Sequence, residues 1–162
     1  MPLRKISISC GRGSGKTSLS AFDNALFNAG IANHNLLHLS SVIPTGFTPV
    51  IEQVNLLDDV TEYGNKLYVV YAARHEQTPQ KEAWAGLGWV MAEAEPSRGL
   101  FVEHEGETEQ EVIDLLTASL TTMTSYRKEN YGPIHYKTAN VLCTGEPVCV
   151  IVAAIYKSVN WD

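Results

Sequence analysis

The most informative stretch of the chain is residues 35–44, which read Asn35-Leu36-Leu37-His38-Leu39-Ser40-Ser41-Val42-Ile43-Pro44. The leucines before the serine pair are typical of a short strand, which we expect over residues 35–39. A turn is predicted soon afterwards, because Pro44 is followed by Gly46 and both residue types interrupt regular structure. Ser40 and Ser41 therefore lie where a strand gives way to a turn.

The serine pair also offers a chemistry of its own. The hydroxyl group of Ser41 can attack the carbonyl carbon of Ser40, and elimination of the resulting ester leaves a pyruvoyl group at the start of the downstream fragment. Such a ketone forms a Schiff base with an amine and then acts as an electron sink. Adjacent serines are common, so the dipeptide alone is explained as well by an ordinary junction between a strand and a turn.

Motifs along the rest of the chain add to this evidence. They are Gly11-Arg12-Gly13-Ser14-Gly15-Lys16-Thr17, Ala21-Phe22-Asp23-Asn24-Ala25-Leu26, Ala29-Gly30-Ile31, Gly86-Leu87-Gly88 and Gly99-Leu100-Phe101-Val102-Glu103. Together with Asn35-Leu36 and the serine pair, their order and spacing resemble the pyruvoyl-dependent arginine decarboxylase family, most specifically over residues 1–50.

The resemblance implies a proenzyme. It would cleave itself between Ser40 and Ser41 into a β chain, residues 1–40, and an α chain, residues 41–162. The implied cofactor is a covalent pyruvoyl group derived from Ser41, with no metal and no dissociable cofactor. The implied reaction converts L-arginine to agmatine and carbon dioxide, in trimers or hexamers whose sites lie between neighbouring subunits.

Two residues upstream of the serines are the expected substrate-binding side chains. Asp23 lies four residues after Leu19 and three before Leu26, so it borders the apolar stripe of a predicted helix. Spacing alone fits a solvated or capping carboxylate equally well, but a carboxylate also matches the planar donor fork of a guanidinium group. The resemblance assigns Asp23 to recognition of arginine, and it assigns Asn35 to holding the scissile peptide and later the pyruvoyl group.

Glu103 is the expected proton donor. After carbon dioxide leaves, a proton must reach the substrate Cα, and a glutamate kept partly protonated by burial or by nearby negative charge suits that task. The catalytic glutamate of the family falls in this region, and apolar residues precede Glu103. Glu93 and Glu95 stay open as alternatives, because position along the chain does not decide among neighbouring carboxylates.

Composition indicates one domain of 162 residues, of which 44% are apolar and 19% charged. The net charge of −6 does not favour a nucleic acid or an anionic membrane as partner. We find neither an apolar run of the ~20 residues that span a bilayer nor a signal peptide, so a cytoplasmic location is expected. Cys10, Cys143 and Cys149 lack the paired spacing of a zinc site.

The five histidines show no convincing metal-ligand spacing. His38 is the most interesting of them, because it precedes Ser41 by three residues. Alternation along a strand places these two side chains on opposite faces, however. We therefore interpret His38 as a solvated or hydrogen-bonded structural residue.

Hydrophobic periodicity predicts an α+β fold. We expect strands over 3–9, 35–39, 66–75, 83–92, 100–104, 134–143 and 147–157, and helices over 18–29 and 108–126. Hairpins are expected between the two strands of 83–104 and between the last two strands, a glycine-rich turn over 11–15, and mostly loop over 42–65. The family resemblance implies their arrangement, a four-layer αββα sandwich of two mostly antiparallel sheets with the helices outside.

Two other functions stay open on the sequence. Gly15-Lys16-Thr17 looks like the end of a phosphate-binding loop, but that pattern requires a glycine at position 10, where the chain has Cys10. A nucleotide-binding or purely structural protein would leave Ser40 and Ser41 joined. A pyruvoyl-dependent decarboxylase of another amino acid would keep the cleavage but would not need Asp23.

Overall fold

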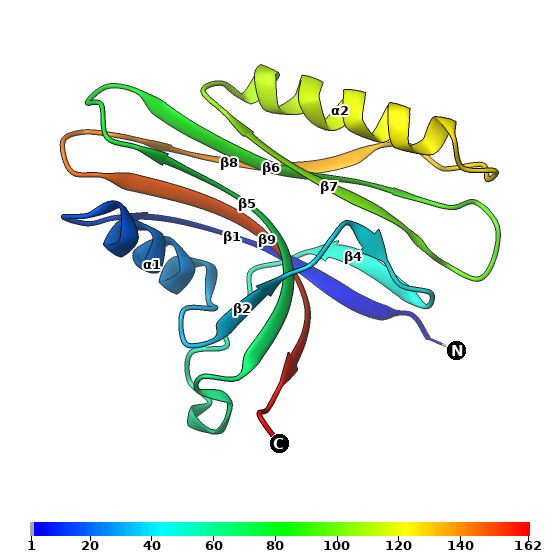
Figure 1. The fold of residues 1–162 in the computed structure, drawn as a ribbon, viewed down its shortest axis with the longest axis horizontal. Coiled ribbons are helices and arrows are strands. Elements are labelled where there is room, and N and C mark those ends of the chain that lie inside the picture. Colours follow the sequence, from blue (N-terminus) through cyan, green and yellow to red (C-terminus); the bar gives the residue numbers. More distant parts are fainter. Residues whose placement is uncertain (1) are drawn as a thin grey trace.

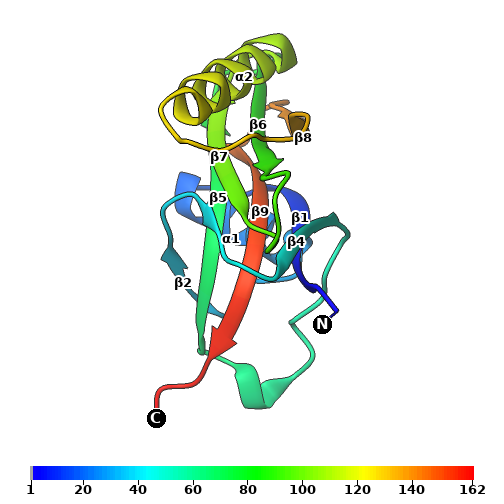
Figure 2. The same ribbon diagram turned by 90° about the vertical axis from the view of Figure 1, so that its right-hand side faces the viewer.

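Two β-sheets lie face to face, and each carries one helix on its outer face (Figures 1 and 2). The structure is a computed structural model that describes residues 2–162. The first sheet has the order β2-β5-β9-β1-β4 and is covered by α1, whereas the second has the order β3-β7-β6-β8 and is covered by α2. Most strand pairs are antiparallel. The predicted α+β sandwich with outer helices is confirmed.

Each sheet, together with its helix, is built from segments that are far apart in the sequence. The first sheet and its helix contain β1 (Arg4–Ser14), α1 (Ser18–Ala29), β2 (Asn35–His38), β4 (Phe47–Ile51), β5 (Lys66–Glu76) and β9 (Val148–Val159). The second contains β3 (Val42–Ile43), β6 (Glu82–Met91), β7 (Gly99–Gly106), α2 (Glu109–Ser125) and β8 (His135–Leu142). A 3-10 turn, η1 (Val60–Glu62), follows β4.

Strand β9 shows why the core lies where it does. Its first seven residues, 148–154, are all buried, without the alternation of a strand that has one wet face. Val150 and Val152 point into the core between the two sheets, whereas Ile151 and Ala153 pack under α1. A strand covered on both faces needs an apolar residue at every position, and this requirement explains the unbroken apolar run.

The glycine-rich segment is strand and not a turn, so that expectation is wrong. Strand β1 continues to Ser14. A Cβ atom on Gly11 would lie 2.1 Å from the carbonyl oxygen of Ala25, and one on Gly13 would lie 2.3 Å from the Ala25 nitrogen. The glycines thus let α1 approach the strand closely, and they form no phosphate-binding loop.

The buried face of α1 differs in part from the one predicted. Leu26 is buried as expected, but Leu19, which was also expected in the apolar stripe, is 76% exposed. Three alanines, Ala21, Ala25 and Ala29, are fully buried. Small side chains are required on this face because Gly11 and Gly13 bring the backbones together. The ends follow prediction: Thr17 caps the start, and Gly30 ends the helix with a φ of 87°.

The last two strands do not form a hairpin. Strand β8 pairs with β6 in the second sheet, whereas β9 pairs with β1 and β5 in the first. The turn between them carries the chain from one sheet to the other, so the two strands face each other across the core (Figure 1). The predicted hairpin of β6 with β7 is confirmed. No helix within residues 2–162 is long and apolar enough to cross a membrane.

Candidate active site

The serine pair lies where the chain passes from the first sheet to the second. Strand β2 ends at His38, and β3 begins at Val42. Before the pair, the Leu39 nitrogen donates a hydrogen bond to the Val69 carbonyl, 2.8 Å away in the first sheet. After it, the Ser41 carbonyl accepts a bond of 2.9 Å from the Phe101 nitrogen in the second sheet. The peptide between Ser40 and Ser41 is therefore held at both ends.

Glu103 lies next to the serine pair. It is in β7, and its Oε2 atom accepts a hydrogen bond of 3.2 Å from Ser41 Oγ. Burial raises the pKa of this carboxyl group, and the neighbouring His38 and the Ser41 hydroxyl oppose that shift without cancelling it. The group is thus suited to hold a proton at a higher pH than an ordinary glutamate does.

The two alternative carboxylates are elsewhere. Glu93 and Glu95 are exposed and lie in the turn that joins β6 to β7, whereas Glu103 is well inside β7. The backbone nitrogen of Glu93 donates to the Asn130 carbonyl, which ties this turn to the segment after α2. Of the three candidates, only Glu103 contacts Ser41.

His38 belongs to the same group of side chains, although the sequence suggested otherwise. Its Nε2 atom is 3.7 Å from Glu103 Oε1, and its ring stacks on Tyr71 with 4.3 Å between ring centroids. The alternation argument failed because the strand stops at His38. Three residues outside the strand separate it from β3, so the side chains of His38 and Ser41 need not point in opposite directions.

Tyr156 is a second residue that sequence reasoning missed. Its hydroxyl group donates a hydrogen bond of 2.8 Å to the Val42 carbonyl, immediately after the serine pair. Burial raises the pKa of Tyr156 far above its usual value, and the negative charge of Glu103 adds to the shift. The phenol therefore stays neutral and keeps its donor. No motif signalled this role, because 114 residues separate the two partners.

A pocket of about 470 Å³ opens beside Glu103. Its wall combines aromatic rings with two carboxylates, and its principal side chains are Phe22, His38, Tyr71, His75, Glu103 and Glu105. Glu105 is paired at 2.6 Å with Arg74. An apolar wall with carboxylates suits a ligand that has both an aliphatic part and a cationic group.

Asp23 does not line this pocket, although its neighbour Phe22 does. It lies on the exposed side of α1, and its carboxylate has no hydrogen bond or ion pair with any of residues 2–162. Within one chain, Asp23 and Ser41 therefore lie at separate places.

Asn35 is also apart from the serines. It begins β2, whereas the serine pair follows the end of that strand. Its Nδ2 atom donates a bond of 2.8 Å to the Gly64 carbonyl, and its own backbone nitrogen bonds to Asn65. In a single chain this side chain satisfies backbone groups and does not contact Ser41.

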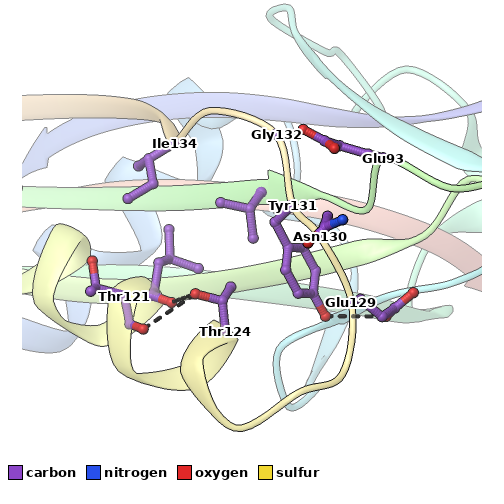
Figure 3. A pocket seen from close by; sticks show the side chains of 10 residues that line it. Glu93, Thr121, Thr124, Glu129, Asn130, Tyr131, Gly132 and Ile134 are labelled. Atoms are coloured by element: carbon purple, nitrogen blue, oxygen red, sulfur yellow. Dashed lines mark hydrogen bonds between the residues drawn. The ribbon is translucent and has the colours of Figure 1, made fainter.

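Another pocket, of about 550 Å³, lies elsewhere in the molecule (Figure 3). It lies between the end of α2 and the segment that follows, and Thr121, Thr124 and Tyr131 are among its lining residues. The Tyr131 hydroxyl donates to Glu129 at 3.2 Å, as the dashed line shows. Neither Ser41 nor Glu103 lines it. Glu93 does, which further separates that carboxylate from the serine pair.

No group of three or more histidine, cysteine, aspartate or glutamate side chains within residues 2–162 is arranged to hold a metal ion. Cys143 and Cys149 are buried, and burial raises the pKa of the Cys149 thiol to about 12. Such a thiol is inert near neutral pH.

Comparison with known proteins identifies a family. The sequence matches the model of the family described as pyruvoyl-dependent arginine decarboxylase over residues 5–160. A Halobacterium salinarum protein of that name is 34% identical over 154 residues, which cover 94% of this chain and 93% of the relative. One from Thermococcus sibiricus is 31% identical over 143 residues, 87% of each chain. The match to the family model covers nearly the entire chain, and residues 23, 35, 40, 41 and 103 lie within the matched range.

Proposed function

The chain belongs to the pyruvoyl-dependent arginine decarboxylase family, and on that premise we propose that it cleaves itself between Ser40 and Ser41 and then converts L-arginine to agmatine and carbon dioxide. One observation carries the proposal. The hydrogen bond of 3.2 Å between Ser41 Oγ and Glu103 Oε2 joins the serine from which the cofactor is made to a carboxyl group that can move a proton.

Self-cleavage begins with attack of Ser41 Oγ on the carbonyl carbon of Ser40. The C–N bond between the two residues breaks, and an ester forms in its place. Loss of the Cα proton of residue 41 then breaks its Cβ–O bond, and Ser40 leaves as a carboxylate. Water replaces the nitrogen of residue 41, which departs as ammonia and leaves a ketone. The bonds to Val69 and Phe101 support this sequence, because they hold the chain on both sides of the reacting peptide.

The residues around position 41 fit the group that this reaction produces. When formed, the pyruvoyl carbonyl supplies the electron-accepting group that decarboxylation of an amino acid requires. Tyr156 holds the Val42 carbonyl, so the segment attached to position 41 keeps its place after the chain is cut. Glu103 delivers a proton to the substrate Cα once carbon dioxide has left, and its raised pKa favours the protonated form from which it acts.

Arginine fits the charge and shape of the site. The aromatic rings of Phe22 and Tyr71 offer a surface for an aliphatic chain and for a cation. Asp23 has no intramolecular partner among residues 2–162, so its carboxylate is available for a guanidinium group. We assign Asp23 to recognition of arginine and Asn35 to support of the cleavage region.

An assembly would complete these assignments, because Asp23 does not line the pocket of its own chain. The helix that carries Asp23 offers a surface for one, since Leu19 is 76% exposed and Phe27 54% exposed. We propose a trimer, or a pair of trimers, in which Asp23 of one subunit completes the site built on Ser41 of its neighbour.

Mixed assemblies test the shared site. As pure assemblies, Ser41→Ala subunits are expected to be inactive, and Asp23→Asn subunits to keep only about one hundredth of the activity on arginine. If the site is shared, unfolding and refolding the two together restores part of the activity, since some sites then combine an intact Asp23 with an intact position 41. Absence of any restoration in verified mixed trimers would place the whole site within one chain.

The substrate is tested by release of labelled carbon dioxide from arginine, lysine, ornithine and a neutral amino acid. We expect arginine to react fastest, and Asp23→Asn to reduce kcat/KM for arginine about 100-fold, as loss of a charged hydrogen-bond partner does. Wild-type activity on a neutral amino acid, with Asp23→Asn unaltered, would make the chain a pyruvoyl-dependent decarboxylase of another substrate.

A further inference from the structure

His38 ends an edge strand of the first sheet, yet its side chain reaches a residue of the second. Its Nε2 atom is 3.7 Å from Glu103 Oε1, while the other carboxylate oxygen, Oε2, faces Ser41 Oγ at 3.2 Å. Each oxygen of the carboxyl group therefore has one partner. Together the two partners define which oxygen points toward position 41.

The imidazole itself is held in place. Its ring lies on the ring of Tyr71, with 4.3 Å between centroids and 22° between planes. Tyr71 belongs to β5, the strand that pairs with β2, so this support comes from the sheet and not from a loop. The His38 side chain is also 41% exposed, which lets the ring exchange protons with water while it contacts Glu103.

Among the charged groups around His38 and Glu103, the basic side chain that contacts the Glu103 carboxylate is His38. The nearby guanidinium of Arg74 is bound to Glu105 at 2.6 Å and lies near Glu107. The remaining titratable side chains around the pair, beside these two carboxylates, are Tyr71, His75 and Tyr156. The His104 ring is turned to Ser119 of α2. Within residues 2–162, His38 is the one basic side chain within 4.0 Å of the Glu103 carboxylate.

We infer that His38 is a positioning residue of the decarboxylation: it orients the Glu103 carboxyl group toward position 41 and governs the proton that this group carries. The inference rests on the proposed function. A positive charge on the imidazole favours the ionised carboxylate and so opposes the effect of burial on Glu103.

The test compares His38→Ala and His38→Gln with His75→Ala as the matched control. His75 lines the same pocket and is exposed, but its ring neighbour is Phe22 and not Glu103. Each protein is assayed with arginine across the pH range, and rates are expressed per processed α chain counted by mass spectrometry. Incomplete self-cleavage in a variant then does not enter the comparison.

Loss of His38 is expected to change kcat and its pH profile while KM stays near the wild-type value. We expect His38→Ala to lower kcat about tenfold, since a catalytic group that loses one of its two supports is less well placed. In the pH profile of this variant, the fall in rate on the alkaline side should occur about half a pH unit higher, because the imidazolium no longer favours the ionised carboxylate. His38→Gln should recover most of kcat but keep this shift of the alkaline side. His75→Ala alters the pocket wall but not the surroundings of the Glu103 carboxyl group, so it should keep the wild-type pH profile.

Two results would overturn the inference while leaving the proposed function intact. One is an active wild-type enzyme whose His38 variants retain its kcat and its pH profile. The other is an equal change in the His38 and His75 variants, which would mean a general effect on the pocket. A wild-type protein that releases no carbon dioxide from any amino acid would instead overturn the proposed function, and this inference with it.

Discussion

Ser41 and Glu103 are separated by 62 residues and are joined by a hydrogen bond of 3.2 Å. The contact depends on the second sheet, because Ser41 immediately precedes β3, and β3 pairs with β7, the strand that contains Glu103. The Phe101 nitrogen bonds to the Ser41 carbonyl and keeps the two segments together. The site is therefore built where the chain changes sheets.

Replacement of Glu103 by glutamine should remove the proton donor while preserving shape. Glutamine can still accept the hydrogen bond from Ser41, so we expect the chain to fold normally. The rate constant kcat for arginine should fall by about 100-fold or more, the usual contribution of a general acid, with a much smaller change in KM. Steady-state kinetics of the processed enzyme measures both.

Glu93→Gln is the control for this experiment. Glu93 lines the separate pocket beside Tyr131, and its loss should leave kcat unchanged. A large loss of activity in Glu93→Gln, with Glu103→Gln fully active, would contradict the assignment of the proton donor.

The raised pKa of Glu103 also predicts a dependence of stability on pH. Between the ordinary pKa of a glutamate and the higher pKa in the folded protein, the folded state binds more protons than the unfolded state. The free energy of unfolding therefore falls as the pH rises through this window. Glu103→Gln removes the titration, so the variant should be more stable than wild type above the window and equal to it below.

Urea denaturation of Ser41→Ala with and without Glu103→Gln measures this difference in uncut chains, from acid to neutral pH. The gap between the two curves should widen with pH. A gap that is constant across the range would mean that the Glu103 carboxyl group titrates as it does in the unfolded chain.

Tyr156→Phe should weaken the support of the segment after the cleavage point. The variant loses the bond of 2.8 Å to the Val42 carbonyl and leaves that acceptor without its partner. We expect a loss of about 1 kcal/mol in the free energy of unfolding, together with slower decarboxylation. Tyr136→Phe is the matched control, because the Tyr136 side chain is 46% exposed and its hydroxyl has no hydrogen bond within residues 2–162. Equal unfolding curves and rates for the two variants would remove this role from Tyr156.

Gly11→Ala tests the close contact of helix and strand. The new Cβ atom would lie 2.1 Å from the Ala25 carbonyl oxygen and 2.5 Å from the Ala29 nitrogen, so α1 must move away from β1. We expect a loss of about 3 kcal/mol in the free energy of unfolding, the upper end for overpacking. Gly132→Ala, whose Cβ atom would meet its nearest neighbour at 3.6 Å, should change the free energy by less than about 0.5 kcal/mol. Similar values for both would argue against this packing.

The sequence predicted most elements because their periodicity is local. It could not show that β8 and β9 belong to different sheets. A polar turn between two apolar segments is typical of a hairpin, but it also occurs where the chain passes from one sheet to the other. The glycines at 11–15 were misread as a turn. Glycine is needed there because the backbone of α1 packs close to the strand, and this contact exists only in the folded protein. His38 was misjudged because alternation holds only within a strand, and β2 ends at His38 itself.

The most direct test of the central claim is the mass of the purified protein under denaturing conditions, before and after reduction with borohydride. We expect two fragments that divide between Ser40 and Ser41, of which the larger gains the mass of one hydrogen molecule on reduction, and a single chain from Ser41→Ala. A wild-type protein that stays uncut under all conditions, or a larger fragment that begins with an unmodified serine, would contradict the account.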